Sequence, residues 1–277
     1  MRVRVATINV QNDEGDPRRT GLLNRALRDL DPDVVVLQEV CYPDRRDQLA
    51  ELTAGTGLAH TTHEAAVLTH KSTLADRFGG MAVATRWPHR VLDTVQGRRW
   101  WTLAVELTVA DLGQALLITP CTPWQLDAAA ARERQVLEIA DLDQRHRRAL
   151  PTIIAGDFNA APDTAGIRFL SGLQSLDGHS VHYHDAWAVA GDGPGHTWST
   201  DNPLAAAQID LAIGQPGHRR RIDYIFVGSW HAHPTTQARI TTAQLFADQP
   251  VDHVWLSDHV GVTADLDVTP DLPRSPQ

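Results

Sequence analysis

Apolar runs that end in an acid or an amide recur along the chain. Residues 3–8 alternate apolar and polar side chains, as a strand with one buried face does, and lead into Asn9. Four later runs share this arrangement, and the polar residues at or beside their ends are Gln38 and Glu39, Asp157 and Asn159, Asp223, and Ser257, Asp258 and His259. Such side chains at the ends of buried strands are costly unless they meet a metal, a ligand or partner groups. Strand ends are also where ligand sites assemble in parallel-rich α/β proteins, so we expect one shared site.

The clearest of these runs lies in residues 151–163. Its apolar segment, 153–155, predicts a strand that is buried on both faces and ends at Gly156. Asp157 and Asn159 follow, and on their own they also fit a tight turn, because both residue types form local hydrogen bonds. The recurrence of the pattern elsewhere in the chain favours a functional site over a turn.

The segments between these strands predict further regular structure. Leucines and alanines recur at helical spacing over residues 22–30, and Asp31-Pro32 ends that helix before the strand at 34–37. This strand, helix, strand unit favours a parallel or mixed sheet with helices on its outer face. The other predicted elements are a helix over 45–53, irregular structure over 60–78, strands over 81–84, 91–95, 101–109 and 115–119, a helix capped by Asp127 and reaching Ala140, a strand before Asp157, a short helix over 167–170, long loops over 176–217 with a strand or turn at 186–189, and a strand over 254–256.

Composition limits the class of protein. The 277 residues are 42% hydrophobic, enough for one large domain or two small ones. Because motifs from both ends must converge on one site, we expect one domain over residues 1–267 with a disordered tail over 268–277. The net charge of -9 argues against a dedicated duplex-DNA binder, although small basic clusters occur. Two cysteines cannot build a disulfide framework, and no apolar run approaches membrane-spanning length. We therefore expect a soluble, cytoplasmic protein without a membrane partner, and nothing indicates an obligate protein partner.

The polar clusters together resemble a known motif series. In order along the chain, they read T-I-N at 7–9, Q-E at 38–39, G-D-F-N at 156–159, R-I-D-Y at 221–224 and S-D-H at 257–259. This ordered set is similar to that of the endonuclease/exonuclease/phosphatase superfamily. The resemblance implies the deoxyribonuclease-I-like fold, an α/β four-layered sandwich in which two mixed β-sheets pack face to face with helices outside. It also implies phosphoester hydrolysis without choosing a substrate.

The resemblance assigns roles to these residues. It implies that Glu39 binds a metal, with Asn9 and Asp258 close to that metal or to the phosphate. Oxygen ligands suit Mg²⁺, with Mn²⁺ as an alternative cofactor. Asp157 is implied to orient or activate the attacking water, and Asn159 to hold that water or a phosphoryl oxygen.

The same resemblance implies that His259 contacts the phosphate while Asp223 holds its other ring nitrogen. A carboxylate partner fixes the tautomer of an imidazole and raises its basicity, so the pairing is chemically sound. No serine or cysteine stands with a base in a recognisable nucleophile arrangement. We therefore expect direct in-line attack by water, with inversion at phosphorus.

One position departs from the family pattern. Many members carry a histidine after the strand that precedes the long helix, where it helps to bind phosphate or to protonate the leaving group. Here Cys121 occupies that position in I-T-P-C-T-P-W, so the resemblance implies that Cys121 contacts the substrate. A thiol donates only a weak hydrogen bond, which weakens the case for cleavage of diesters with poor leaving groups. Trp124 and Trp198 resemble residues at the rim of the family's site, where they would contact substrate, although packing is the alternative for both.

Other clusters have simpler explanations. His179, His182 and His184 resemble a zinc box, as do His60, His63 and His70, but neither group has companion ligands at a known spacing. Cys41 lies two residues after Glu39 and would form a redox or soft-metal pair with Cys121 if both lay at one mouth; two unrelated cysteines are the alternative.

Three functions remain at this stage. The first is a Mg²⁺-dependent phosphoesterase for a phosphodiester or phosphomonoester, with a phosphorylated small molecule favoured by the acidic balance and a nuclease on DNA or RNA as the alternative. The second is a binding module on an inactive hydrolase scaffold, motivated by Cys121. The third is another metal-assisted reaction on a metabolite.

Overall fold

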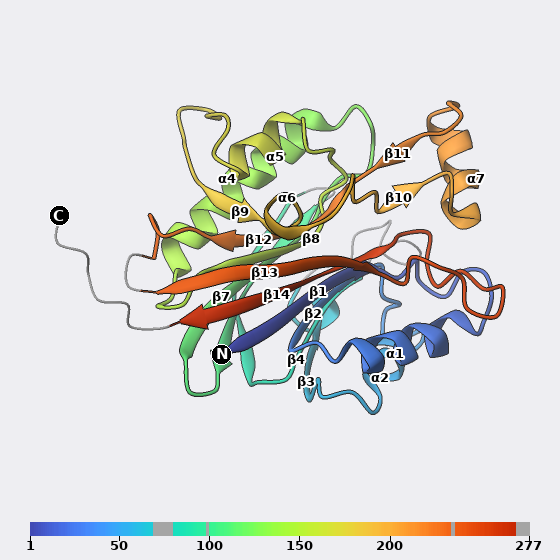
Figure 1. Cartoon of the computed structure of the whole chain (residues 1–277), viewed down its shortest axis with the longest axis horizontal. Coiled ribbons are helices and arrows are strands. Elements are labelled where there is room, and N and C mark those ends of the chain that lie inside the picture. Colours follow the sequence, from blue (N-terminus) through green and yellow to red (C-terminus); the bar gives the residue numbers. More distant parts are fainter. Residues whose placement is uncertain (69–79, 98–99, 234–235, 270–277) are drawn as a thin grey trace.

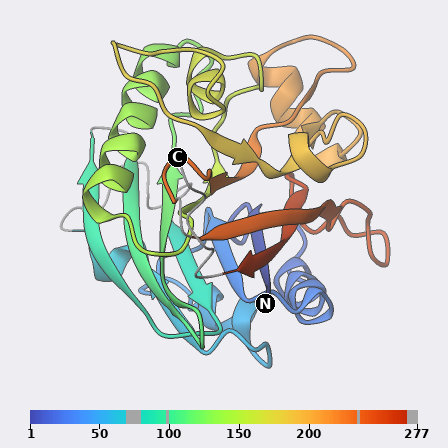
Figure 2. The same ribbon diagram turned by 60° about the vertical axis from the view of Figure 1, so that its left-hand side comes forward.

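The computed structural model describes residues 1–68, 80–97, 100–233 and 236–269. Within these ranges, two six-stranded β-sheets pack face to face and helices cover their outer faces (Figure 1). Figure 2 shows α4 along the outside of the second sheet and the N-terminal helices beside the first. The predicted α/β sandwich of two mixed sheets is confirmed.

The first sheet combines both ends of the described chain. Its strand order is β13-β14-β1-β2-β4-β3. β1 and β2 are parallel and joined by a helix, as predicted, whereas β14 is antiparallel to β1. The elements of this half are β1 (Arg2–Asn9), α1 (Arg19–Leu30), β2 (Val34–Gln38), α2 (Gln48–Thr53), β3 (His60–His63), the 3-10 helix η1 (Glu64–Ala66), β4 (Met81–Thr85), β13 (Gln237–Phe246) and β14 (Gly261–Thr269).

The second sheet follows the order β5-β6-β7-β8-β12-β9. β7 and β8 are parallel and connected by the long helix α4, while β12 is antiparallel to β8. Its elements are β5 (His89–Gln96), β6 (Trp101–Val109), β7 (Gly113–Cys121), α4 (Ala129–His146), β8 (Ile153–Asp157), α5 (Ala165–Leu170), β9 (Tyr183–Asp185), α6 (Ala186–Ala190) and β12 (Asp223–Gly228); a separate hairpin-like pair, β10 (Trp198–Ser199) and β11 (Arg219–Arg220), flanks α7 (Pro203–Ala212).

Three apolar clusters produce the layers. The central cluster lies between the sheets and takes side chains from both, such as Val5 and Val36 from the first and Val105 and Ile225 from the second. A second cluster fills the space under α1 and α2, and a third fills the space under α4 and α5. Because β2 is buried on both faces, its continuous apolar run contributes to two of these clusters.

Several sequence predictions were wrong locally. Residues 254–256 are not a strand: they form a connection whose Val254 and Leu256 are buried in the cluster under α1. Asp127 does not cap α4, which follows Ala128 without a side-chain cap. Residues 186–189 are helical, because Asp185 accepts hydrogen bonds from the first amides of α6.

Other elements were missed. β3 lies in the segment that we predicted to be irregular, and α7 lies in the predicted long loops, where Asn202 caps a helix that begins with Pro203. β13 and β14 were not predicted as strands. The predicted tail, apart from its first two residues, and the latter part of the segment over 60–78 lie outside the described residues. In the described ranges, no helix is long and apolar enough to cross a membrane.

Candidate active site

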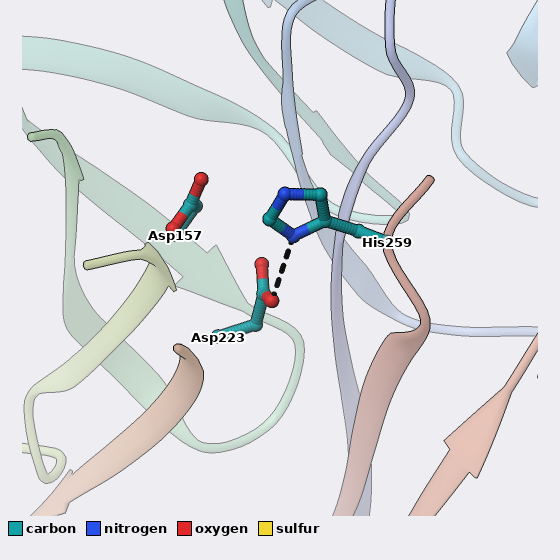
Figure 3. A group of neighbouring side chains, drawn as sticks. All are labelled: Asp157, Asp223 and His259. Carbon is teal, nitrogen blue, oxygen red and sulfur yellow. Dashed lines mark hydrogen bonds and ion pairs between the residues drawn. The ribbon is translucent and has the colours of Figure 1, made fainter. Parts of the chain in front are cut away.

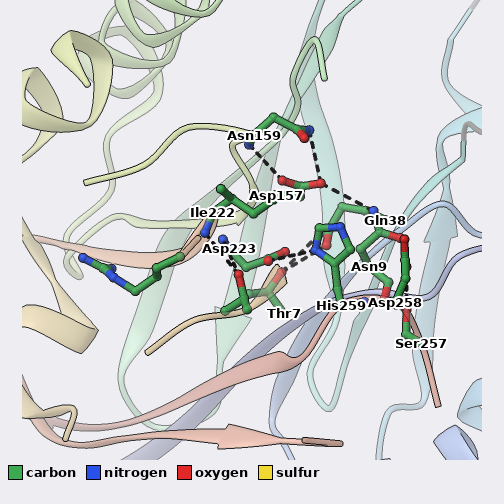
Figure 4. Close-up of polar contacts among 12 residues, drawn as sticks. Thr7, Asn9, Gln38, Asp157, Asn159, Ile222, Asp223, Ser257, Asp258 and His259 are labelled. Atoms are coloured by element: carbon green, nitrogen blue, oxygen red, sulfur yellow. Dashed lines mark hydrogen bonds and ion pairs between the residues drawn. The ribbon is translucent and has the colours of Figure 1, made fainter. Parts of the chain in front are cut away.

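Several strand ends meet at one edge of the sandwich, where the two sheets face each other (Figure 4). β1 ends at Asn9 and β2 ends one residue before Glu39; because these strands are parallel, both residues leave the same edge. β8 ends at Asp157, directly opposite Asp223 at the start of antiparallel β12. His259 lies two residues before β14 begins. The topology therefore brings together motifs from both ends of the sequence.

Asp157, Asp223 and His259 form the tightest group. Each has a ligand atom within 4.8 Å of the others, and all three are buried (Figure 3). His259 Nδ1 lies 2.9 Å from Asp223 Oδ2, so a proton on Nδ1 is donated to this carboxylate. Oδ1 of Asp223 is buried and has no hydrogen-bond partner in the described part of the chain. An orphaned, buried carboxylate oxygen indicates a position where water, a ligand or an ion completes the site.

Asp157 is held by two amides from different parts of the chain. Its Oδ1 accepts from the Asn159 backbone N–H at 2.8 Å, and its Oδ2 accepts from Asn159 Nδ2 at 3.2 Å and from Asn9 Nδ2 at 3.4 Å. Gly156 allows this strand end to approach β7, since a Cβ there would lie 3.1 Å from the Pro120 carbonyl oxygen. The carboxylate is thereby fixed between the two sheets.

Glu39 lies on the other side of the same mouth. It accepts hydrogen bonds from Asn9 Nδ2 at 3.1 Å and from Asn12 Nδ2 at 3.5 Å. Its φ of 55° is left-handed, a conformation that a non-glycine residue adopts only when the surroundings require it. Ser257 Oγ donates to the Asn9 carbonyl at 2.6 Å and brings Asp258 to this side. The predicted metal-binding residues are therefore neighbours.

The electrostatics of the mouth are dominated by acids. Burial, together with repulsion from Asp258, raises the pKa of Glu39 to about 8. Burial and the Asp223 charge raise the pKa of Asp157 to about 6. Burial alone would lower the pKa of His259, but the Asp223 carboxylate outweighs it and raises that pKa well above its usual value. This arrangement favours a bound cation or protons.

The donor set fits a hard divalent cation. Glu39, Asn9 and Asp258 offer carboxylate and amide oxygens, the ligands that Mg²⁺ prefers, and part of the Glu39 side chain is open to solvent, so water can complete the coordination. In the described ranges, Asp157, Asp223 and His259 are the one group of three His, Cys, Asp or Glu residues whose ligand atoms all lie within 4.8 Å of one another. The histidine groups that resemble zinc boxes are not among the groups with close ligand atoms: the ring centroids of His182 and His184 lie 4.9 Å apart in an edge-to-face contact, and His70 lies outside the described residues.

The three predicted substrate contacts differ in their surroundings. Cys121 ends β7, where burial and the nearby Glu64 and Asp157 charges raise the pKa of its thiol well above the usual value, so the thiol is neutral. Trp124 is 62% exposed on the loop after β7. Trp198 is buried in a small cluster with residues of α7, which is the packing alternative. Cys41 and Cys121 are both free thiols.

Residues that the sequence did not reveal hold these side chains in place. Arg19 is buried and donates to carbonyl oxygens of the loop after Asn9 and to the Leu256 carbonyl, joining two distant segments of the site. Asn202 Nδ2 donates to the carbonyls of Ser257 and Asp258 at 2.8 and 3.2 Å. These contacts end on backbone atoms, which leave no sequence signal; the N-P pair at 202–203 was the one local cue.

Comparison with known proteins identifies the family. A model of the endonuclease/exonuclease/phosphatase family matches residues 6–259, and the chain belongs to this family. No curated protein sequence matches the chain. Solved structures that are similar to it include D. rerio TDP2 complexed with a single-strand DNA product, with a TM-score of 0.69 and 18% identity, covering 96% of this chain and 99% of that one. Truncated Caenorhabditis elegans TDP2 is also similar, with a TM-score of 0.67 and 17% identity, covering 96% of this chain and 97% of that one.

A bacterial structure is also similar. The endonuclease/exonuclease/phosphatase protein from Beutenbergia cavernae has a TM-score of 0.66 and 23% identity, covering 96% of this chain and 71% of that one. At such identities the likeness concerns the fold. The family is one of hydrolases that generally act on phosphoester bonds and typically depend on a divalent metal.

Proposed function

We propose that this protein is a metal-dependent phosphoester hydrolase in which water attacks a phosphodiester or phosphomonoester directly and in line. The observation that supports the proposal most strongly is the convergence of Asp157, Asp223 and His259 from three separate segments, next to Glu39 and Asn9. Family membership supports the reaction class.

In this proposal Glu39, Asn9 and Asp258 hold Mg²⁺, or alternatively Mn²⁺. The ion, when bound, neutralises charge on the phosphoryl oxygens and on the leaving oxygen. The excess of acids at the mouth supports a cation here, because the pKa of Glu39 is raised first by burial and then by repulsion from Asp258, and a positive charge would oppose both effects.

The remaining residues act on water and phosphate. Asp157, fixed by the amides of Asn159 and Asn9, orients the attacking water and takes its proton. His259 presents Nε2 to the phosphate as a donor, since the Asp223 carboxylate holds Nδ1 and favours the protonated ring. These groups are in place before substrate arrives, which reduces the cost of reorganisation during the reaction.

The substrate can be a small molecule or a nucleic acid. The net charge of -9 favours a phosphorylated small molecule over extended duplex binding. The nuclease alternative gains support from the similar fold of D. rerio TDP2, whose structure contains a single-strand DNA product. The competing hypothesis is a diverged, inactive family member, because Cys121 stands where many members carry a histidine.

The central test is hydrolysis of bis(4-nitrophenyl) phosphate with Mg²⁺. We expect activity that chelation by EDTA abolishes, and we expect Asp157→Ala and His259→Ala each to lower kcat by at least about a thousandfold because each removes a group that acts on the reacting atoms. Asp192→Ala and His179→Ala, which change exposed residues, are matched controls and should keep full activity. Unchanged turnover in either site variant, with the fold intact by circular dichroism, would refute the roles.

A further inference from the structure

Two arginines near the Asn159 turn form no ion pair with a carboxylate in the part of the chain that the structure describes. Arg220 is partly buried in β11, and its Nη2 donates to the Asn159 carbonyl oxygen at 3.1 Å; in the described part of the chain this is its one side-chain hydrogen bond. Arg132, in the first turn of α4, donates to the carbonyls of Pro123 and Gln125 at 2.8 and 2.7 Å. A guanidinium has five donors, so Arg220 in particular keeps most of its hydrogen-bonding capacity.

The fold holds both arginines at the mouth. β11 pairs with β10, placing Arg220 opposite the buried Trp198, and the Thr197 N–H donates to the Arg220 carbonyl at 2.9 Å. On the other side, Asn159 Nδ2 lies 3.5 Å from the carbonyl oxygen of Thr122, at the start of the loop that Arg132 ties down. Arg132 also lines a small pocket with Phe158 and Ala160, the residues on either side of Asn159, so the two side chains approach the Asn159 turn from different elements.

The charge of Arg220 acts on Arg132. Burial and the Arg220 charge both lower the pKa of Arg132, and burial lowers the pKa of Arg220. Acids lie in the surroundings, namely Asp157 for both arginines, Asp163 for Arg220, and Asp127 and Glu133 for Arg132, but in the described ranges neither arginine forms an ion pair with them. Arg219, the neighbour of Arg220, contrasts with this, because it pairs with Asp201 at 2.7 Å.

We propose that Arg220 and Arg132 bind a second phosphate of the substrate, next to the phosphate that is hydrolysed. The proposal rests on the proposed function, since it extends the same site. Guanidinium groups bind phosphate through paired hydrogen bonds, and two neighbouring cations that lack counterions favour an anion between them. A substrate with one phosphate would leave this pair unused.

The surroundings indicate the chemistry beside that phosphate. Arg132 holds the two carbonyl groups on either side of Trp124, whose side chain is 62% exposed. An exposed indole next to a phosphate subsite offers a stacking surface for a nucleobase. The substrate class is therefore a phosphodiester with an adjacent phosphate and an aromatic base, which both a phosphorylated dinucleotide and a single strand provide.

The experiment compares the thymidine dinucleotide TpT with its 5′-phosphorylated and 3′-phosphorylated forms, in Mg²⁺. For the wild type we expect kcat/KM to be at least about tenfold higher for one phosphorylated form than for TpT, as expected for hydrogen bonds to a charged group. In Arg220→Gln this ratio should fall to within about twofold of one, whereas Arg219→Gln should retain it. Taking the ratio within each variant cancels any general loss of chemistry.

The outcomes separate the two proposals. Hydrolysis of TpT and bis(4-nitrophenyl) phosphate without a phosphate preference, or a preference that survives in Arg220→Gln, would overturn the second-phosphate subsite and leave the hydrolase intact. Failure to hydrolyse any of these diesters would count against the hydrolase itself. A DNA single strand of ten nucleotides distinguishes the two kinds of substrate. If its kcat/KM is much higher than that of the phosphorylated dinucleotide, the substrate is a nucleic acid strand; if the two values are equal, it is a dinucleotide. Both results support the subsite.

Discussion

Two regions of the molecule contain buried carboxylates, and these carboxylates differ in their hydrogen bonding. Glu64 is fully buried next to the sheet, where its carboxylate accepts hydrogen bonds from the Tyr42 hydroxyl, the Trp101 indole and the Met81 backbone N–H. In the candidate site, by contrast, Asp223 keeps one buried oxygen without a partner in the described ranges. Burial of an acid is therefore not by itself a sign of function; unfilled acceptor capacity is the difference.

The contrast extends to the neighbours of each acid. Burial raises the pKa of Glu64 to about 7 without repulsion from another acid, and the hydrogen bonds from the surrounding protein donors oppose this rise. At the site, the pKa values of Glu39 and Asp157 are raised by burial and also by the charges of other acids. An acid whose oxygens all accept hydrogen bonds stabilises the packing around it. Acids that repel one another are expected where a bound cation or substrate reduces that repulsion.

The largest expected effect comes from making the same chemical change in both regions. Asp223→Asn keeps an oxygen that can accept from His259 Nδ1 but removes the charge, and we expect kcat for bis(4-nitrophenyl) phosphate to fall by about a hundredfold to ten-thousandfold. Glu64→Gln should change kcat by less than about threefold, because Glu64 serves the packing. Similar losses in both variants would remove the distinction between the regions.

A second prediction concerns stability and pH. The pKa of Glu64 is about 7 in the folded protein and about 4.5 when exposed, so the folded state holds its proton more tightly and stability falls as pH rises from about 4.5 to 7. The loss has an upper limit of about 3 kcal/mol. Glu64→Gln should remove that part of the slope, since an amide does not titrate and its NH₂ can donate to the Tyr42 hydroxyl.

The measurement is urea unfolding of both proteins between pH 5 and pH 8, without added metal. The difference between wild type and Glu64→Gln isolates this carboxylate from the acids of the site, which titrate in both. Parallel slopes would mean that Glu64 is ionised at neutral pH despite its burial.

The smallest expected effect comes from Cys121, whose pKa is raised by burial and by charges from both regions. Cys121→His places a stronger donor near Asp157, so we expect kcat/KM to rise by up to about tenfold for diesters with poor leaving groups, and to stay constant for 4-nitrophenyl esters, whose leaving group needs no proton. Loss of activity towards every diester would instead indicate a pocket adapted to the thiol.

Much of the site could be predicted because strand ends are visible in the sequence. The acids and amides after apolar runs at Asn9, Glu39 and Asp157 mark the edge where parallel strands finish, and the motif order supplied the fold. Asp258 and His259 were found by their motif, although the apolar run before them is not a strand: Val254 and Leu256 are apolar because they are buried under α1.

Other features left weak signals. β13 is an edge strand with mostly exposed or half-buried residues, so it lacks a clear alternation. α6 is too short to show helical periodicity. The contacts of Arg19 and Arg220 to backbone carbonyls join segments that are far apart in sequence, and such hydrogen bonds depend on tertiary structure rather than on residue pattern. Site residues were thus predictable where a polar side chain directly follows an apolar run with a clear strand pattern.

The place of β14 in the first sheet has a consequence for synthesis of the protein. This strand lies between β13 and β1, and the residues just before it include His259. A nascent chain that has emerged from the ribosome only as far as residue 260 has its first strand without one of its two neighbours, although all the candidate site residues have been made. Since His259 is carried to the site by the connection into β14, complete assembly of the candidate site is expected to wait until residues 261–269 can pair with β1.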